Sequence, residues 1–558
     1  MKFLSYGKQW IDDDDIRAVV ETMRSAFLTQ GPKLEEFEER ICEYTGAKYC
    51  IAVASGMAAL HIAVASLQIE KHKEGITSPN TFVASSNCMI YNGVKPIFAD
   101  IDSKTYCIDP EKIKEKITEN TRLIIPVHFA GQPCEMKSIF KIAKKNNIFV
   151  IEDAAHAIGS KHEDGSKVGS CKYSDLTIFS FHPVKTITAG EGGVITTDNK
   201  ELYERLLLLR NHGITKSEMR ILGYNYRLSD IHASLGISQL KKLDKFVERR
   251  REIVKKYNEA FISVDWLAIP YEKPGVYSAF HLYVLQIDFD KIGKPRREVM
   301  EELKSRNIGT QVHYIPVHTQ PYYQENYGYK RGDCPIAEDY YEKALSIPLY
   351  PRMINDDVDY VIKSIVELKN ETNFNKYICL EKIRYSFGGY SIIPIRKTDM
   401  ELIRQWRNEQ IEILRQKMPI TMREQRRYFK EFIKPLFNEK KPDQILFSYL
   451  LNEELIGYGG LTNIDWESKR AEVSFILDTK RTIDGSLYRK EFSSFFKLIR
   501  QIAFKCLFFH RLYIEIFDIR LFRIFLFEEE GFVLEGRLKD HVLINKTYYD
   551  SLIYGLIN

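Results

Sequence analysis

The sequence predicts an α/β protein built from a large, mixed, mostly parallel sheet domain, a small α/β domain and a further α/β domain. Short apolar strands alternate with helical stretches of 10–15 residues, which is the pattern of a parallel sheet covered by helices on both faces. The 558 residues exceed what one hydrophobic core organises. The last third also has an apolar periodicity of its own. We therefore predict domains at 1–250, 251–372 and 380–558, with a linker at 373–379.

The elements of the first two domains follow from hydrophobic periodicity and from turn residues. Because ligands of such sheets bind at the carboxyl ends of the strands, we expect the functional residues there. We predict helices at 12–23, 34–45, 56–67, 135–146, 200–211, 241–261, 296–306 and 356–370, and strands at 51–54, 123–127, 148–151, 176–181, 194–197 and 281–287.

The composition is that of an ordinary globular protein, with 44% apolar and 28% charged residues. No apolar run approaches the roughly 20 residues of a membrane helix, and the N-terminal stretch lacks the apolar centre of a signal peptide. Nine cysteines without a C-x-x-C pair favour a reducing cytoplasm over disulfides or zinc. The net charge of +5 suits a phosphorylated ligand but is too small to indicate nucleic acid.

Two polar residues follow neighbouring predicted strands. Asp153 ends the run that begins at Ile148, and Lys185 follows the run from Leu176 to Phe181 in a loop rich in glycine. A lysine that forms a Schiff base and a carboxylate that holds a protonated pyridine nitrogen are what pyridoxal phosphate (PLP) requires. On spacing alone, ordinary polar residues at strand ends explain the pattern equally well.

Longer motifs around both residues decide between these interpretations. Glu152 to Ala157 reads EDAAHA, and Ser180 to Gly193 reads SFHPVKTITAGEGG. Both resemble signatures of the DegT/DnrJ/EryC1/StrS sugar aminotransferases. The resemblance implies a PLP-dependent transferase of fold type I, in which Lys185 is the catalytic Schiff-base lysine and moves a proton. It also implies that Asp153 binds the pyridine nitrogen, His156 lies against the ring and Ser180 binds the phosphate.

Further cofactor contacts follow from the same resemblance. Ser55 and Gly56 form a strand-to-helix turn whose free N–H groups suit a phosphate. Met57 stands where the family often has Thr or Ser, and Phe82 is expected to stack on the pyridine. Asn225, in the run GYNYRLSD, is expected to reach the cofactor of a second subunit, so we predict a homodimer with shared active sites.

The resemblance also indicates where a nucleotide-linked sugar binds. The LTQG segment and the GYNYRLSD run have structural alternatives, namely a helix connector and a helix N-cap at Ser229. His313 and His318 lack a third ligand nearby, so we predict no metal site. The expected substrate-binding residues are Tyr6, Leu28, Thr29, Gln30, Gly31, Ser55, His182, Arg227, His313, Tyr314, Ile315 and Pro316.

Within that family the chain resembles the transaminases of pseudaminic acid synthesis. This implies that glutamate donates an amino group to a UDP-linked 4-keto-6-deoxy-N-acetylhexosamine. A dTDP-linked keto-sugar with a non-catalytic C-terminal domain is one alternative, and a scaffold that keeps the fold is another. A sugar dehydratase is improbable because such enzymes have histidine where this chain has Lys185.

The last domain resembles a GNAT-type N-acetyltransferase, which would acetylate the amine that the first domains make. The resemblance rests on Trp406-Arg407-Asn408, Ile456-Gly457, Gly531-Phe532 and Glu535-Gly536. We predict strands at 391–396, 444–451, 455–462, 470–478 and 511–517 with two at the end, and helices at 398–412, 421–434, 489–508 and 520–530.

The segment that should bind acetyl-CoA departs from the family. Such domains hold the diphosphate on N–H groups of a glycine-rich loop, but residues 480–490 contain only Gly485. Arg481, Arg489 and Lys490 either compensate by charge or form a solvated face. The family's Asn and Tyr after the next strand fall near Arg520 and Phe527, and Glu472 and Tyr488 are candidates for the acid–base role. Both an active and a non-catalytic domain remain open at this point.

Overall fold

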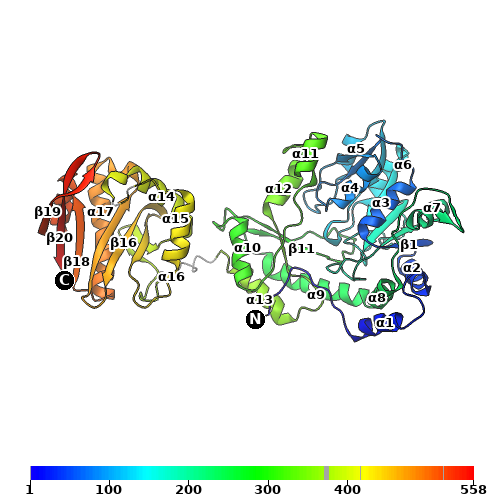
Figure 1. Cartoon of the computed structure of the whole chain (residues 1–558), viewed down its shortest axis with the longest axis horizontal. Helices are drawn as coiled ribbons and strands as arrows, with labels where there is room; N and C mark the ends of the chain where they lie inside the picture. Colours follow the sequence, from blue (N-terminus) through cyan, green and yellow to red (C-terminus); the bar gives the residue numbers. More distant parts are fainter. Residues whose placement is uncertain (1, 370–375, 415, 417, 520) are drawn as a thin grey trace. The chain divides into compact units, whose positions relative to one another are not determined.

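The computed structural model describes residues 2–369, 376–414, 416, 418–519 and 521–558 (Figure 1). The chain divides into two compact units, Met1–Lys369 and Asn370–Asn558, each with its own core. Part of the predicted linker, 373–375, and Arg520 lie outside the described residues. No described helix has both the length and the apolar composition that a membrane crossing requires.

The first unit is built on a seven-stranded sheet that is parallel except for β7, which runs antiparallel to both of its neighbours. The mixed, mostly parallel sheet expected from the sequence is therefore confirmed. In sheet order the strands are β1 (Tyr49–Val53), β7 (Gly193–Thr197), β6 (Leu176–Ser180), β5 (Phe149–Asp153), β4 (Thr121–Ile125), β2 (Glu74–Thr77) and β3 (Lys95–Phe98).

Both faces of this sheet are covered, so its strands are apolar at nearly every position. Along β5, Ile151 packs in the cluster beneath α3 and α4, whereas Val150 packs in the cluster on the opposite face. In β6, Ile178 packs in the cluster beneath α3 and α4, whereas Phe179 packs on the opposite face of the sheet. Since successive side chains of a strand point to opposite faces, Asp153 shares the face of Ile151 and Glu152 has the other. The two adjacent carboxylates therefore face different surroundings and have different roles.

Several helices of the first unit begin with a capping side chain or with a proline in the first turn. Asp12 and Asp15 form a capping box on α1, and Ser229 accepts the N–H of His232 at the start of α8, as predicted. The helices are α1 (Asp13–Met23), α2 (Pro32–Thr45), α3 (Gly56–Ser66), α4 (Ala84–Tyr91), α5 (Pro110–Lys116), α6 (Met136–Lys145), α7 (Lys200–Arg210), α8 (Asp230–Leu240), α9 (Leu243–Phe261), α10 (Arg296–Ser305), α11 (Pro321–Tyr327), α12 (Pro335–Lys343) and α13 (Asn355–Val366).

The long helix α9 leads into a small antiparallel sheet of β10 (Leu267–Ala268), β11 (Tyr283–Ile287) and β12 (Ala344–Ile347). Arg250 of α9 is buried, and its guanidinium donates to the carbonyl oxygens of His281 and Leu349. These hydrogen bonds offset part of the cost of burying the charge. Arg250 thereby fixes the segment that carries His281 against the helix.

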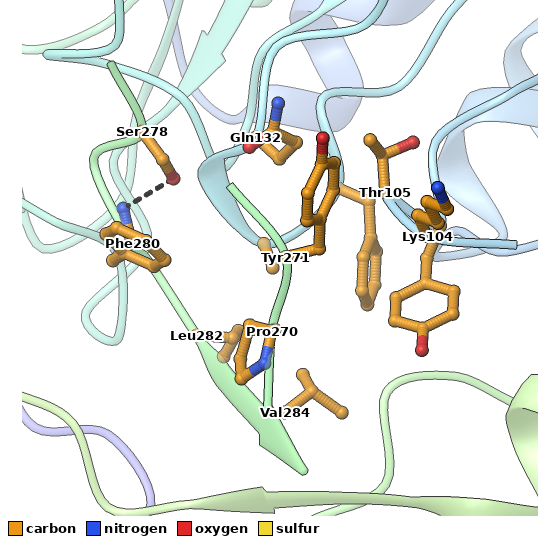
Figure 2. Close-up of a pocket in the computed structure, with 12 residues that line it drawn as sticks. Lys104, Thr105, Gln132, Pro270, Tyr271, Ser278, Phe280, Leu282 and Val284 are labelled. Carbon is orange, nitrogen blue, oxygen red and sulfur yellow. Dashed lines mark hydrogen bonds between the residues drawn. The ribbon is translucent and has the colours of Figure 1, made fainter. Parts of the chain in front are cut away.

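A small void lies between the loop at Lys104–Tyr106 and the segment from Pro270 to Val284 (Figure 2). Its volume of about 20 Å³ is on the scale of one water molecule. Gln132 lines the void, and its buried Oε1 has no hydrogen-bond partner among the described residues. The void is too small for a substrate, so the candidate site lies elsewhere.

The second unit contains an eight-stranded mixed sheet, and its parallel pair is β17 with β18. In sheet order the strands are β13 (Tyr385–Phe387), β14 (Tyr390–Pro394), β15 (Ile445–Leu451), β16 (Glu454–Asp465), β17 (Arg470–Leu477), β18 (Arg511–Phe517), β20 (Thr547–Ile557) and β19 (Val533–Ile544). The helices are α14 (Met400–Glu409), α15 (Met422–Tyr428), α16 (Lys434–Leu436), α17 (Gly485–Arg500) and α18 (Leu521–Glu529).

The central helix of this unit, α17, presents one apolar stripe to the sheet. Tyr488, Phe492, Phe495 and Ile499 recur at helical spacing and are buried. The sequence predicted a helix over 489–508, but α17 begins at Gly485 because Asp484 caps it. A π-helical turn over Gln501–Cys506 follows, so the regular α-helix ends earlier than predicted.

Candidate active site

A cavity of about 580 Å³ opens at the carboxyl ends of β5 and β6, where the sequence placed the functional residues. Its size is that of a site for a cofactor or a small substrate. Twelve predicted site residues line it: Tyr6, Ser55, Gly56, Met57, Phe82, Asp153, His156, Ser180, His182, Lys185, His313 and Tyr314.

Asp153 and Lys185 share this cavity. The Asp153 carboxylate accepts the Ser85 hydroxyl at 2.6 Å and the Ala155 backbone N–H at 3.1 Å, so its orientation is fixed. Burial lowers the pKa of Lys185 to about 8, although the negative charge of Asp153 opposes the shift. At neutral pH a larger fraction of Lys185 than of a solvent-exposed lysine is therefore unprotonated, and the unprotonated form is the one that acts as a nucleophile.

The start of α3 forms the opposite end of the cavity. Ser55 caps the helix by accepting the N–H of Ala58. The N–H groups of Gly56 and Met57 belong to the first turn and have no partner within the helix. A Cβ on Gly56 would lie 2.8 Å from that of Ser180, and one on Gly193 would lie 2.4 Å from the Ser55 carbonyl oxygen. The glycines therefore permit a close packing that leaves N–H groups facing the cavity.

Histidines form one wall. His156 and His281 have ring centroids 4.5 Å apart, and the Tyr314 hydroxyl lies 3.2 Å from His156 Nε2. Burial, followed by the positive charge of Lys185, holds the pKa of His156 well below its usual range. The same two causes lower the pKa of His313 to about 4. These histidines are therefore neutral at physiological pH and act as hydrogen-bonding groups.

Glu152, adjacent to Asp153, is buried on the other face of the sheet. Its carboxylate contacts His128 Nε2 at 2.8 Å and accepts the hydroxyls of Ser174 and Thr177. Burial alone would raise the pKa of Glu152, but the His128 contact and the charge of His162 hold it at about 2. Glu152 thus connects β5 to neighbouring segments on one face of the sheet, whereas Asp153 faces the cavity on the other.

These groups fit pyridoxal phosphate. An amine with a lowered pKa matches its aldehyde, an oriented carboxylate matches its ring nitrogen, and the start of α3 with Ser180 matches its phosphate. His156 Nδ1 is buried in the cavity wall without a hydrogen-bond partner among the described residues. Phe82 lines the cavity and is 61% exposed, so its aromatic ring is accessible to a planar ligand.

Other predicted site residues lie outside this cavity. Ile315 and Pro316 follow Tyr314 and do not line it. Asn225 is exposed, and Arg227 donates to Asn211 at 2.6 Å. The LTQG segment is tied to the start of α8, where the Asp230 carboxylate accepts the N–H of Gly31. A second cavity of about 760 Å³ is lined by Gln30, Gly31 and Arg227 but not by Leu28, Thr29 or Asn225.

Several lining residues had no sequence signal. His281 comes from the small domain, whose approach to the large sheet depends on tertiary packing. A polar residue in an otherwise apolar strand run, such as His281 before Leu282–Ile287, was the only available sign. The lining residues that were not predicted are Leu60, Thr81, Ala84, Val127, Ala155, Ile178, Val184, Glu191 and His281.

No group of three metal-ligating side chains is arranged for a cation in the part of the chain that the structure describes. His313 Nδ1 lies 2.8 Å from the Ser346 hydroxyl, and His318 Nε2 lies 2.9 Å from the Glu338 carboxylate. The two histidines therefore have separate structural partners.

The second unit has its own cavity, of about 510 Å³, between β17 and β18. Glu472, Tyr488 and Phe527, which were singled out in the sequence, line it together with Arg407. The Glu472 carboxylate accepts the Asn463 amide at 2.6 Å. Apolar and aromatic side chains of β17 and α17 form much of the remaining wall.

Comparison with known proteins assigns both units. Residues 9–366 match the DegT/DnrJ/EryC1/StrS aminotransferase family, and residues 392–553 match the acetyltransferase (GNAT) domain. The chain is 44% identical over 382 residues to an uncharacterized protein of Methanocaldococcus jannaschii, in an alignment that covers 66% of this chain and 98% of the relative. It is 42% identical over 380 residues to the spore coat polysaccharide biosynthesis protein SpsC of Bacillus subtilis, covering 66% and 97%.

Solved structures agree with these matches. Helicobacter pylori PseC, an aminotransferase involved in the biosynthesis of pseudoaminic acid, superposes with a TM-score of 0.63 at 31% identity and covers 66% of this chain and 100% of its own. A putative sugar aminotransferase from Streptococcus pneumoniae in its PLP form gives a TM-score of 0.63 at 29% identity, covering 66% and 99%.

Proposed function

We propose that this chain, which belongs to the DegT/DnrJ/EryC1/StrS aminotransferase family and carries a GNAT domain, transfers an amino group from glutamate to a UDP-linked 4-keto-6-deoxy-N-acetylhexosamine. Members of the family are PLP-dependent sugar aminotransferases, so a keto-sugar and an amino donor are the expected substrates. The observation that carries the proposal is the cavity shared by Lys185 and Asp153.

Each side chain has a role in this reaction. When bound, pyridoxal phosphate supplies an electron sink for the carbon that bears the migrating amino group. Asp153, which Ser85 and Ala155 fix in place, would hold the pyridine nitrogen in its protonated form. Ser55, Gly56 and Ser180, which line the cavity, would hold the phosphate. Lys185 has a pKa of about 8, so it can both accept and return a proton at neutral pH.

The identity of the sugar rests on the relatives. SpsC is named for spore coat polysaccharide biosynthesis, and PseC for the biosynthesis of pseudoaminic acid. Both names support a precursor of a surface polysaccharide or glycan. Tyr6, His313 and Tyr314 lie together in the cavity, with the rings of Tyr6 and His313 5.2 Å apart, and are available for a sugar. A pseudaminic acid-type sugar is the specific substrate that we propose.

The second unit extends the reaction sequence. GNAT domains use acetyl-CoA, and the amino transfer produces a primary amine, so we propose that this domain N-acetylates that amine. The amine is protonated in water and must lose its proton before it attacks the thioester. Glu472 and Tyr488 line the cavity of this unit and are candidates for that role.

We propose a homodimer with shared active sites. The outward face of α1 exposes Ile16, Val20 and Met23 at helical spacing, and the exposed Phe27 and Leu28 follow. Such a patch is typical of a protein interface. It leads directly into the LTQG segment, which lines no part of the Lys185 cavity of its own subunit. A second copy over this face would give the LTQG segment and Asn225 access to a neighbouring site.

Incubation with glutamate and candidate keto-sugars, followed by mass spectrometry and NMR, tests the activity. Purified protein should absorb visible light and lose that absorbance with glutamate. Lys185→Ala should abolish both the absorbance change and the amino transfer while the protein remains folded by circular dichroism. Turnover by Lys185→Ala at near the wild-type rate would contradict the assignment.

A further inference from the structure

The segment that leads into β11 has a strained backbone beside the Lys185 cavity. Phe280 has a φ of +45°, in the left-handed region that residues with a side chain rarely adopt. Strain of this kind costs free energy, so it persists only where the surrounding contacts fix the backbone. The next residue, His281, lines the cavity. The strained position therefore determines how His281 enters the site.

Contacts from several parts of the chain hold this segment in place. The Ser160 hydroxyl accepts the N–H of Ala279 at 2.9 Å and donates to the carbonyl oxygen of Gly131 at 2.8 Å. Gly131 has a φ of +99°, and a Cβ at this position would lie 3.0 Å from the backbone nitrogen of His281. Arg250 donates to the carbonyl oxygen of His281 at 3.1 Å. These contacts hold the strained backbone and fix the position from which the His281 side chain projects.

The stability of the fold does not by itself account for a histidine at position 281. The side chain is 4% exposed, and its Nδ1 is buried without a hydrogen-bond partner among the described residues. Burial of an unpaired polar atom costs free energy that an apolar side chain would avoid. The His281 ring also packs against the His156 ring, with centroids 4.5 Å apart, but an apolar side chain would make that contact as well. A polar group at this position is therefore best explained by a ligand of the cavity.

The charges around the cavity indicate which ligand His281 contacts. Lys185, which would engage the aldehyde of the cofactor, is the only lysine or arginine among the described residues that line the cavity. Burial, followed by the charge of His156, holds the pKa of His281 well below its usual range, so its imidazole is neutral at physiological pH. A neutral imidazole forms hydrogen bonds with hydroxyl and amide groups, whereas the carboxylates of glutamate pair best with cations. His281 thus suits the sugar better than the amino donor.

We propose that His281 recognises the keto-sugar through a hydrogen bond to a hydroxyl or acetamido group of the sugar ring. This inference rests on the amino transfer proposed above and names a residue that distinguishes the sugar from glutamate. His281 comes from the segment before β11, whereas His313 and Tyr314 come from the segment after α10. The sugar would therefore be bound by two separate segments of the small domain.

Calorimetry on the full-length protein loaded with PLP separates the sugar from the nucleotide. UDP-N-acetylglucosamine carries hydroxyl and acetamido groups but no ketone, so it serves as a probe that does not react, and UDP reports the nucleotide alone. The variant His281→Leu keeps a side chain of similar volume and lacks a nitrogen. It should weaken the binding of UDP-N-acetylglucosamine about three- to tenfold, as expected for one hydrogen bond to an uncharged group, and leave that of UDP within about twofold. An unchanged ratio of the two affinities would overturn the inference.

Two further variants separate the polarity of His281 from its shape and from general stability. His281→Gln keeps a donor and an acceptor, so it should lose less affinity for UDP-N-acetylglucosamine than His281→Leu. Equal losses in both would contradict a hydrogen bond to the sugar. His318→Leu is the matched control, because His318 is also a buried histidine whose Nδ1 has no partner among the described residues, but it does not line the cavity. It should leave the ratio of the two affinities unchanged, and a change would assign the effect to a general loss of stability.

The reaction with glutamate provides a second readout. In His281→Leu the rate at which glutamate removes the visible absorbance should change by less than about twofold, whereas kcat/KM for the keto-sugar should fall about three- to tenfold. If both fall equally, His281 does not distinguish the two substrates, and this inference fails while the proposed amino transfer stands. If the wild-type protein transfers no amino group to any keto-sugar, the inference and the proposed function both fail.

Discussion

At the scale of single residues, the protonation of Lys185 sets the reactivity of the site. Burial lowers its pKa to about 8 and Asp153 raises it. Only the unprotonated amine attacks an aldehyde, so the amine becomes reactive as pH rises through the pKa. We predict that the rate at which cofactor-free protein takes up pyridoxal phosphate rises with pH up to about 8 and then levels off.

The variant Asp153→Asn tests the electrostatic part of this prediction. Without the carboxylate nothing favours the ammonium form, so the midpoint of the pH dependence should fall, by roughly one unit. The comparison uses the midpoint and not the amplitude, because the variant also weakens the hold on the pyridine nitrogen. A midpoint that stays in place or moves to higher pH would show that Asp153 does not act on Lys185.

At the scale of elements, strand β5 depends on the buried carboxylate of Glu152. Its pKa is held at about 2, below the value of an unfolded glutamate, so ionised Glu152 stabilises the fold above about pH 4.5. That contribution is lost as pH falls toward 2. We predict that Glu152→Gln lowers the free energy of unfolding by roughly 3 kcal/mol at pH 7.

Thermal unfolding at several pH values checks this prediction. The variant and the wild type should converge only as pH falls through about 2, where the carboxylate of folded wild-type protein is also protonated. Glu163→Gln, at an exposed glutamate in the turn after Lys161, is the control and should change the stability by less than about 0.5 kcal/mol. If Glu152→Gln lowers the free energy of unfolding by the same amount at every pH, the negative charge of Glu152 does not stabilise the fold.

The same strand shows how much the sequence could predict. The order of the elements, the mixed sheet and the meeting of Asp153 with Lys185 follow from apolar periodicity and from the motifs. The different roles of Glu152 and Asp153 depend on which face of the sheet each side chain takes. His128 and Ser174, which contact the Glu152 carboxylate, lie on other segments of the chain.

Contacts made through tertiary packing had no such signal. His281 reaches the cavity because Arg250 holds its segment against α9, and no local pattern encodes that contact. The cap at Asp484 is local in sequence, but the composition of the glycine-poor loop before the predicted helix does not indicate that the helix begins at Gly485.

At the scale of the whole molecule, subunit sharing is testable by complementation. If Asn225 serves the partner's cofactor, a mixture of Lys185→Ala and Asn225→Ala subunits forms heterodimers in which one site has both residues intact. Equimolar mixing should then recover about a quarter of the wild-type activity, since half of the dimers are mixed and each has one of two sites restored. Absence of recovery after mass spectrometry has shown subunit exchange would exclude sharing through Asn225.

The two units of the chain should also separate the two proposed reactions. The solved aminotransferases from Helicobacter pylori and Streptococcus pneumoniae are covered over 100% and 99% of their length by 66% of this chain, so a protein ending at Lys369 has a comparable length and is expected to fold. Given keto-sugar, glutamate and acetyl-CoA, the full chain should yield the N-acetylated sugar, whereas the shortened protein should stop at the free amine. The rate of amine formation should be the same in both, because the Lys185 cavity lies within the first unit. Mass spectrometry distinguishes the two products by the acetyl group. A free amine from both proteins would mean that the second unit does not acetylate this sugar, and an acetylated product from both would assign the acetyl transfer to chemistry outside it.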